Sequence, residues 1–244
     1  MKNNLLKKLN WDSDFFGLKV GRLIVSDSDV FDSLSFEKKV ISNDFDLVYV
    51  VSLKKMLDFD ILSALPLSLM DIQITMSKKS DKSECVDYPY EFRTELSEKE
   101  LEECYSILDQ TAAVSRFFNE PTIGSEKTKK LYRRWLDNAV STNFADGIII
   151  AKKNNKIVGI HIVKTDSDIG HCSVIGVSEN EKGSGIGRDL WFQALSYWNS
   201  MGTIKKYHVP FSIQNSESFN FHLKIGFNKV EEVKYIYHYR KKTL

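Results

Sequence analysis

The stretch of this chain best suited to chemistry is a glycine-rich loop, Lys182-Gly183-Ser184-Gly185-Ile186-Gly187-Arg188. Glycines at alternate positions let a backbone approach a ligand without clashes from Cβ atoms. A helix that starts directly after the loop points free amides and a partial positive charge at the same place. A pyrophosphate is the group that such an arrangement binds best. The stripe that predicts this helix consists of Ile186, Leu190, Trp191, Ala194, Leu195 and Trp198.

Two common phosphate loops do not fit this stretch. The dinucleotide fingerprint GxGxxG fails because the third glycine comes one residue early, and no acidic residue follows about twenty residues later to hold a ribose. A P-loop fails because no Lys-Ser or Lys-Thr pair follows the last glycine. A flexible turn with incidental glycines stays open as the alternative.

The elements that position this loop fall into two segments, divided by a polar stretch at residues 77–84 that is typical of a linker. We predict a small α/β domain over residues 1–80 and a larger domain over residues 85–244. In the first segment, the residue pattern predicts strands over 16–25, 44–51 and 70–76 and a short helix over 58–65.

The second segment has a clearer order. Ser97 and Glu100 have the spacing of a capping box, so a helix begins there. Asn154-Asn155 suits a tight hairpin between two strands, and Gly202 is placed to end the helix after the loop. The predicted order is helices over 98–110 and 126–140, strands over 148–152, 157–164 and 171–177, the loop and its helix, and a strand over 206–213.

An antiparallel meander that feeds a glycine loop and a helix resembles the GNAT superfamily of N-acyltransferases. Their signature loop reads Gln/Arg-x-x-Gly-x-Gly/Ala, and Lys182, Gly185 and Gly187 occupy its three marked positions. Lys182 departs from the usual arginine or glutamine but keeps a positive charge. The resemblance covers roughly residues 95–240. It implies an α/β (α+β) GNAT fold, a central and mostly antiparallel sheet flanked by helices, with a smaller N-terminal α/β domain.

A second motif of the superfamily follows the strand over 206–213. Asn215, Ser218, Gly226 and Phe227 match it at the right spacing, and His222 stands where these proteins usually have tyrosine. The resemblance implies acyl-CoA, either acetyl-CoA or a short acyl-CoA, as co-substrate, and no metal. It implies these residues for the coenzyme: Val177, Lys182, Gly183, Ser184, Gly185, Ile186, Gly187, Arg188 and Asn215.

The resemblance also implies two catalytic positions. A backbone amide near Gly176 and Val177 would donate to the thioester oxygen. His222 would protonate the departing sulfur in place of tyrosine, although a substrate contact or a packed helix histidine are open alternatives. His171 and His208 lie on strands that border the acyl gap and are candidates for substrate contact or for a base, with ordinary core or surface histidines as the open alternative.

A narrower resemblance is to the TDP-fucosamine acetyltransferases, two-part enzymes that N-acetylate a nucleotide-linked amino-dideoxy sugar. It rests on the opening at residues 9–17 and on Ser115-Arg116-Phe117. It implies a nucleotide-sugar substrate with Arg116 and Phe117 in its site, because a guanidinium suits bidentate contact with phosphate. Trp11, Phe15 and Phe16 could stack on a base, but we expect them to pack the first segment onto the second.

Composition sets the remaining expectations. The net charge is +1 and the basic residues are scattered, which argues against nucleic acid as a partner. Three cysteines without a CxxC pair favour reduced thiols and a cytoplasmic protein, and no apolar run is long enough to cross a membrane. A homodimer is possible. Two other functions stay open: a GNAT enzyme for another small-molecule or protein amine, and a non-catalytic acyl-CoA sensor.

Overall fold

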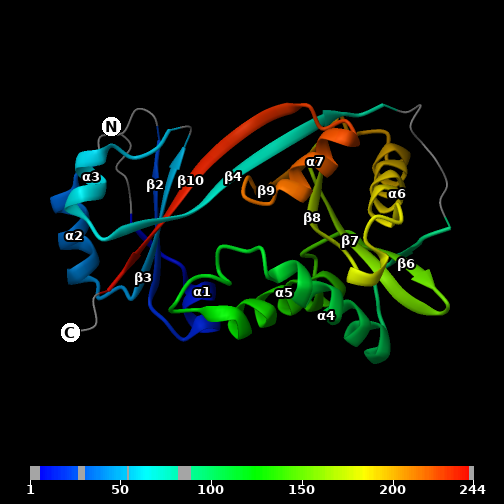
Figure 1. The fold of residues 1–244 in the computed structure, drawn as a ribbon, viewed down its shortest axis with the longest axis horizontal. Coiled ribbons are helices and arrows are strands. Elements are labelled where there is room, and N and C mark those ends of the chain that lie inside the picture. Colours follow the sequence, from blue (N-terminus) through cyan, green and yellow to red (C-terminus); the bar gives the residue numbers. More distant parts are fainter. Residues whose placement is uncertain (1–5, 27–30, 54, 82–88, 242–244) are drawn as a thin grey trace.

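The computed structural model describes residues 6–26, 31–53, 55–81 and 89–241. They form a single ten-stranded sheet, which spans the molecule from end to end (Figure 1). The strands lie in the order β1 (Lys7–Lys8), β2 (Val20–Val25), β3 (Leu47–Leu53), β10 (Lys229–Arg240), β4 (Leu67–Lys79), β9 (Lys206–Ser212), β8 (Ile169–Val177), β7 (Lys156–Asp166), β6 (Gly147–Lys153) and β5 (Glu91–Arg93).

The two longest strands join the halves of the sheet. β4 and β10 run antiparallel beside each other through most of the molecule (Figure 1). β10 also pairs with β3, and β4 also pairs with β9. The C-terminal strand therefore lies inside the part of the sheet that the N-terminal segment builds, so the two predicted domains share one sheet.

Most neighbouring strands are antiparallel, as the sequence predicted. The two parallel pairs are β2 with β3 and β8 with β9. The residues predicted as a hairpin turn, Asn154 and Asn155, both have a positive φ, 52° and 59°. Together with the helices on both faces, this arrangement confirms the predicted fold class.

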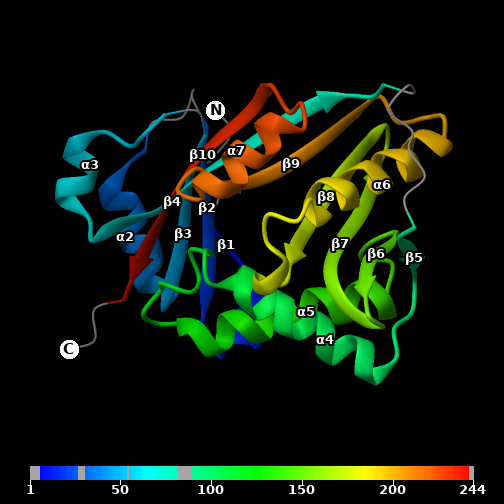
Figure 2. The same ribbon diagram turned by 45° about the vertical axis from the view of Figure 1, so that its right-hand side comes forward.

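Helices cover both faces of the sheet (Figure 2). On one face lie α1 (Asn10–Phe16), α4 (Glu98–Ala112) and α5 (Gly124–Ser141). On the other lie α2 (Ser33–Ser42), α3 (Phe59–Ala64), α6 (Ile186–Ser200) and α7 (Ser216–Lys224). Ser97 caps α4 in a complete capping box with Glu100, as predicted. No helix in the described ranges has the length and apolar character needed to cross a membrane.

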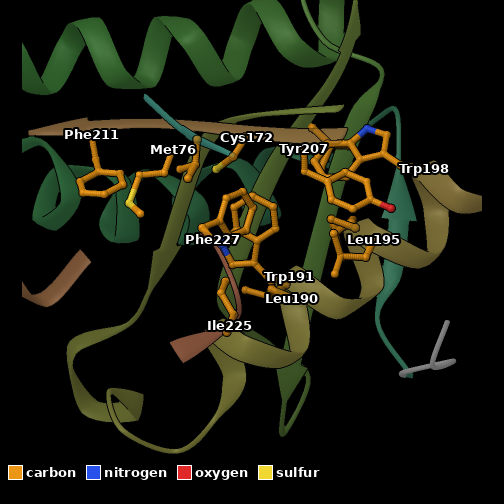
Figure 3. Packing of buried hydrophobic residues seen from close by; sticks show 14 of the residues in the cluster. Met76, Cys172, Leu190, Trp191, Leu195, Trp198, Tyr207, Phe211, Ile225 and Phe227 are labelled. Atoms are coloured by element: carbon orange, nitrogen blue, oxygen red, sulfur yellow. The ribbon is translucent and has the colours of Figure 1, made fainter. Parts of the chain in front are cut away.

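Aromatic side chains form the centre of the core between α6 and the sheet. Trp191 and Trp198 are 1% and 0% exposed, which confirms that the helical stripe is a core face. Figure 3 shows them with Tyr207, Phe227 and aliphatic neighbours from the sheet and α6. Burial of these large aromatic rings holds α6, which follows the glycine loop directly, against the sheet.

A bulge in β8 changes which side chains face each helix layer. The register against β7 shifts at Ile162/Val163, which leaves Ser173 as the extra residue of β8. Before the bulge, Gly170 packs against Trp198 of α6. After it, Gly176 packs against Ile107 and Thr111 of α4. The bulge therefore rotates the end of β8 where the predicted site begins.

Several sequence predictions need correction. The linker predicted from residue 77 begins inside β4, because Ser77 and Lys79 pair with β9; residues 82–84 lie outside the described ranges. The strand predicted from residue 16 begins at Val20, because residues 10–16 form α1. α2 and β10 were not predicted. Trp11 is 46% exposed and not core, although Phe16 is buried as expected.

Candidate active site

The site begins where two neighbouring strands separate. β8 and β9 are parallel and paired at three positions, of which His171 with His208 is the last. Beyond this point the edge of β8 that faces β9 has no strand partner in the described ranges. The main-chain groups along this edge are free to bind an extended ligand, as the resemblance implied.

A pocket of about 600 Å³ lies along this gap. It brings together the end of β8, the glycine loop, the start of α7 and the end of α4. Its lining residues are Gln110, Thr111, Val114, Ile175, Gly176, Val177, Glu181, Lys182, Gly183, Gly185, Ile186, Gly187, Arg188, Asn215, Glu217, Ser218, Phe221 and His222. Every residue predicted for the coenzyme is among them except Ser184, whose hydroxyl donates to the carbonyl of Glu181.

The glycine loop has the geometry of an anion site. Gly183 and Gly185 have φ values of 78° and 93°, a region that residues with a side chain rarely adopt. Gly185 is also the N-cap of α6, and among the described residues no side chain caps this helix. The first intrahelical bond is from the amide of Asp189 to the carbonyl of Gly185, so the amides of Ile186 and Gly187 precede it. These amides are the donors that a pyrophosphate would need.

The charged side chains of the loop lie at the rim. Lys182 pairs with Glu179 at 2.7 Å, and Arg188 Nε pairs with the neighbouring Asp189 at 2.9 Å. Lys182 and Arg188 are both more than half exposed, so these pairs are weak and can exchange for phosphate oxygens. The main-chain amides at the start of α6 are therefore the fixed donors of the loop, and these side chains are its movable charges.

The amide of Val177, not that of Gly176, faces the gap. The amide of Ser178 bonds to Val158 of β7. Strand amides alternate in direction, so the Gly176 amide also points to β7 and the Val177 amide points away from it. Close packing explains why residue 176 is a glycine. A Cβ there would lie 2.7 Å from Thr111 Oγ1 and 2.8 Å from Ile107 Cγ2.

His222 is buried and both of its ring nitrogens have partners. Trp191 Nε1 donates to Nε2 at 3.2 Å, and Nδ1 lies 2.7 Å from the Ser218 carbonyl. The tautomer that satisfies both bonds carries its proton on Nδ1 and donates it to Ser218. Burial lowers the pKa of His222 to about 4, despite the opposing bond to Ser218. The imidazole is therefore neutral at pH 7, and its one proton is already bonded within α7.

Asn215 has a local structural role as well as a place in the pocket. Its Oδ1 accepts from the amide of Ser218 at 3.0 Å, so it caps α7. Asn215 also lines the pocket. The same residue can therefore fix the start of α7 and donate to a coenzyme.

The four residues predicted for the substrate lie outside this lining. His171 and His208 face each other at the closed end of the gap, with ring centroids 5.4 Å apart. Burial lowers the pKa of both, and Lys206 and His171 lower that of His208 further. Phe117 is buried between α1 and β3, and the guanidinium of Arg116 lies 4.1 Å from its ring centre.

Sequence reasoning missed the wall that α4 contributes. Gln110, Thr111 and Val114 line the pocket, and Gln110 also accepts from the amide of Glu179 beside the loop. Their sequence carries no motif, and only their place at the end of a predicted helix could have indicated them. No group of three metal-ligating side chains occurs within the described ranges. Cys104 and Cys172 are free and buried, and Cys85 lies outside those ranges.

Solved structures share this fold across most of the chain. A functionally unknown conserved protein from Staphylococcus epidermidis matches with a TM-score of 0.69 and 12% identity, over 99% of this chain and 93% of that one. A GCN5-related N-acetyltransferase from Sphaerobacter thermophilus matches with a TM-score of 0.54 and 12% identity, over 86% and 68%. At these identities the likeness shows the fold.

The sequence model described as the acetyltransferase (GNAT) family matches residues 101–227. This match covers more than half of the chain, and the chain belongs to this family of acyl-CoA-dependent N-acyltransferases. A mycothiol acetyltransferase from Thermobispora bispora is 32% identical over 97 residues, which are 35% of this chain and 30% of the relative. The chain thus matches about a third of that relative's length.

Proposed function

We propose that this protein transfers an acetyl or short acyl group from acyl-CoA to the amine of a small molecule. One observation carries the proposal. The pocket runs from the uncapped start of α6 along the end of β8, beyond the point where β8 and β9 separate. A pyrophosphate at the loop would leave the thioester arm to extend along β8, because its free edge offers amides and carbonyls.

The reaction is a direct attack. The neutral amine forms a bond to the thioester carbon, and the carbon–sulfur bond breaks. The amide of Val177 donates to the carbonyl oxygen as negative charge develops on it. The nitrogen loses one proton to a base or to water, and the sulfur leaves as a thiolate or takes up a proton. Because a thiol has a pKa of about 8.5, the thiolate is a fair leaving group near neutral pH.

We assign His222 a positioning role instead of acid catalysis. Its neutral ring ties Trp191 of α6 to Ser218 of α7, so the two helices that flank the pocket keep a fixed spacing. His171 and His208 remain candidates for the base, since their lowered pKa values favour neutral rings near pH 7 that can accept a proton.

The acceptor we favour is a nucleotide-linked (TDP) amino-dideoxy sugar. Two features support it. Arg116 offers a guanidinium for phosphate, and Trp11 presents an exposed ring that is stacked on Phe15 and could bind a base. Another small-molecule amine is the second candidate. A protein amine or a non-catalytic sensor would need neither the guanidinium nor the exposed ring.

The experiment is a thiol-release assay with acetyl-CoA and several short acyl-CoA donors. The acceptors are TDP-amino sugars, the free amino sugars and a polyamine. Thiol release that requires the TDP-sugar supports the favoured acceptor, and release with the other amines supports the second candidate. Binding of acyl-CoA by calorimetry without release on any amine would favour the sensor. No heat with any acyl-CoA would refute the proposal itself.

A further inference from the structure

Four buried polar atoms on one face of the sheet have no hydrogen-bond partner among the described residues. Native proteins leave few such atoms, because each costs free energy unless a ligand or water pairs with it. They come from β3, β4, β10 and the segment between α4 and α5. The atoms are Tyr49 Oη, Asp71 Oδ1, Arg116 Nε and His238 Nε2.

These atoms lie in one neighbourhood. The guanidinium of Arg116 is 5.8 Å from the ring centre of Tyr49, and the rings of Tyr49 and His238 are 4.9 Å apart. Burial lowers the pKa of Arg116, while Tyr49, Asp71, Tyr132 and Asp12 raise it. Residues that are distant along the chain therefore act on one guanidinium.

The guanidinium and the nearest carboxylates do not pair. No carboxylate in the described ranges lies within 4.0 Å of Arg116, although Asp71 is only 5% exposed. The same face contains a paired arginine, since Arg240 Nε bonds to Glu120 at 2.7 Å. Arg116 is half-buried with its Nε enclosed, and Asp71 is buried. Charges in such places are costly without a counter-ion, so these two unmatched charges indicate that something else completes them.

Two elements that carry this cluster also border the pocket or the gap beside it. Thr111 and Val114 line the pocket, and Arg116 follows two residues later on the same segment. Asp71 is two residues before Gln73, which pairs with Ser212 at the end of β9, the strand that borders the gap. Asp71 and Gln73 have the same parity on β4 and so face the same side of the sheet.

We propose that this cluster binds the acceptor, and that the acceptor is an amine that also carries an acid group. The inference rests on the proposed function and deepens it. The acid group, a carboxylate or a phosphate, pairs with Arg116. A donor group of the same molecule, ammonium or hydroxyl, bonds to Asp71, and Tyr49 completes the contacts. The N-terminal strands therefore supply the specificity for a reaction that occurs in the C-terminal part.

The test compares matched amines in the thiol-release assay with acetyl-CoA. In the first comparison each L-amino acid, which carries a carboxylate, is matched with its neutral amide. In the second a TDP-amino sugar, which carries phosphate, is matched with the free amino sugar. The protein should prefer the acid-bearing member of one pair by about 100-fold in kcat/KM, and Arg116→Met should abolish that preference. A preference for the amino acids over their amides would identify a carboxylate as the group that Arg116 binds. A preference for the TDP-amino sugar over the free sugar would identify a phosphate. Arg134→Met, a change at an exposed arginine, is the matched control and should have no effect.

A binding measurement tests the site without catalysis. With saturating CoA present to fill the pyrophosphate loop, the amino acids or TDP should raise the melting temperature of the wild type. They should not raise that of Arg116→Met or Asp71→Asn. Without ligand, Arg116→Met should melt at or above the wild-type temperature, because it removes an unpaired buried charge.

The outcomes separate the two proposals. Equal use of neutral and acid-bearing amines, unchanged by Arg116→Met, would overturn this inference and leave the acyltransferase proposal intact. A sharp loss of stability in ligand-free Arg116→Met, with CoA affinity retained, would mean that Arg116 is structural and would also overturn it. Failure to bind any acyl-CoA would instead count against the proposed function.

Discussion

Two glycines in the loop, two positions apart, have different reasons for being glycine. Gly185 has a φ of 93°, which a side chain disfavours. Gly187 has no positive φ, and an added Cβ would make ordinary contacts of 3.5 Å with Phe221. The signature position of Gly187 accordingly also accepts alanine, whereas that of Gly185 does not.

We therefore expect Gly185→Ala and Gly187→Ala to differ. Backbone strain of about 1–3 kcal/mol at residue 185 would shift the loop away from its ligand-binding shape and raise the Kd for CoA about tenfold. Gly187→Ala should change the Kd by less than about twofold, since helix position and space both permit alanine. Isothermal titration calorimetry measures both, and an equal loss in the two variants would contradict the assigned loop geometry.

His222 predicts a pH dependence of stability. Its pKa is about 4 in the folded protein and about 6.5 when unfolded. Between these values the unfolded chain binds the proton and the folded one does not. The free energy of unfolding should therefore fall as the pH is lowered from 6.5 to 4, with a share from His222 of up to about 3 kcal/mol. His161, with a pKa lowered to about 3 by burial, adds in the same direction.

His222→Gln should flatten part of this slope in urea titrations between pH 4 and 7. It should lower kcat by less than about threefold, because a positioning residue is being replaced by another hydrogen-bonding side chain. Loss of a general acid typically costs about 10²–10⁴ in rate. A kcat reduced that far, with CoA affinity unchanged, would restore the acid role to His222.

At the scale of elements, contact between β8 and α4 fixes the end of β8 that carries the Val177 amide. The bulge at Ser173 turns Gly176 toward α4, and the absence of a side chain lets strand and helix approach closely. The same turn directs the Val177 amide to the gap. The packing of β8 on α4 and the direction of the Val177 amide thus depend on the same close contact at Gly176.

Gly176→Ala should destabilise the protein by about 1–3 kcal/mol, because the new methyl group would overlap Thr111 and Ile107. It should also lower kcat, as β8 and the Val177 amide move. Thr111→Ala in the same chain should recover part of both losses by removing the oxygen at 2.7 Å. Chemical denaturation and thiol-release rates provide the measurements, and the absence of any recovery would argue against this packing explanation.

At the scale of the whole molecule, β10 is the strand on which both halves depend. It pairs with β3 over seven residues and with β4 over ten. Tyr237 is 1% exposed, and its hydroxyl accepts from the amide of Leu57. A strand that comes last in the chain therefore completes the core that the first segment begins.

We expect one cooperative unfolding transition for the whole chain. In a Trp11→Phe background, whose remaining tryptophans lie on α5 and α6, Tyr237→Ala in the N-terminal half of the sheet should still lower the melting temperature seen by tryptophan fluorescence. Leu136→Ala on α5 is the matched core variant of the second half and should shift the same single transition. Two separate transitions in either variant would show that the halves unfold independently.

The sequence by itself determined the local structure and the glycine loop. Alternating glycines, a capping box and helical stripes depend on residues close in the chain, so α4, α5, the hairpin and the start of α6 could be predicted. Tertiary structure decided the rest. The partners of His222, the close packing of Gly176 and the unpaired charges of Asp71 and Arg116 each join residues from different elements. Only the folded sheet, with β10 inserted between β3 and β4, brings such residues together, because contacts between distant segments leave no periodic pattern in the sequence.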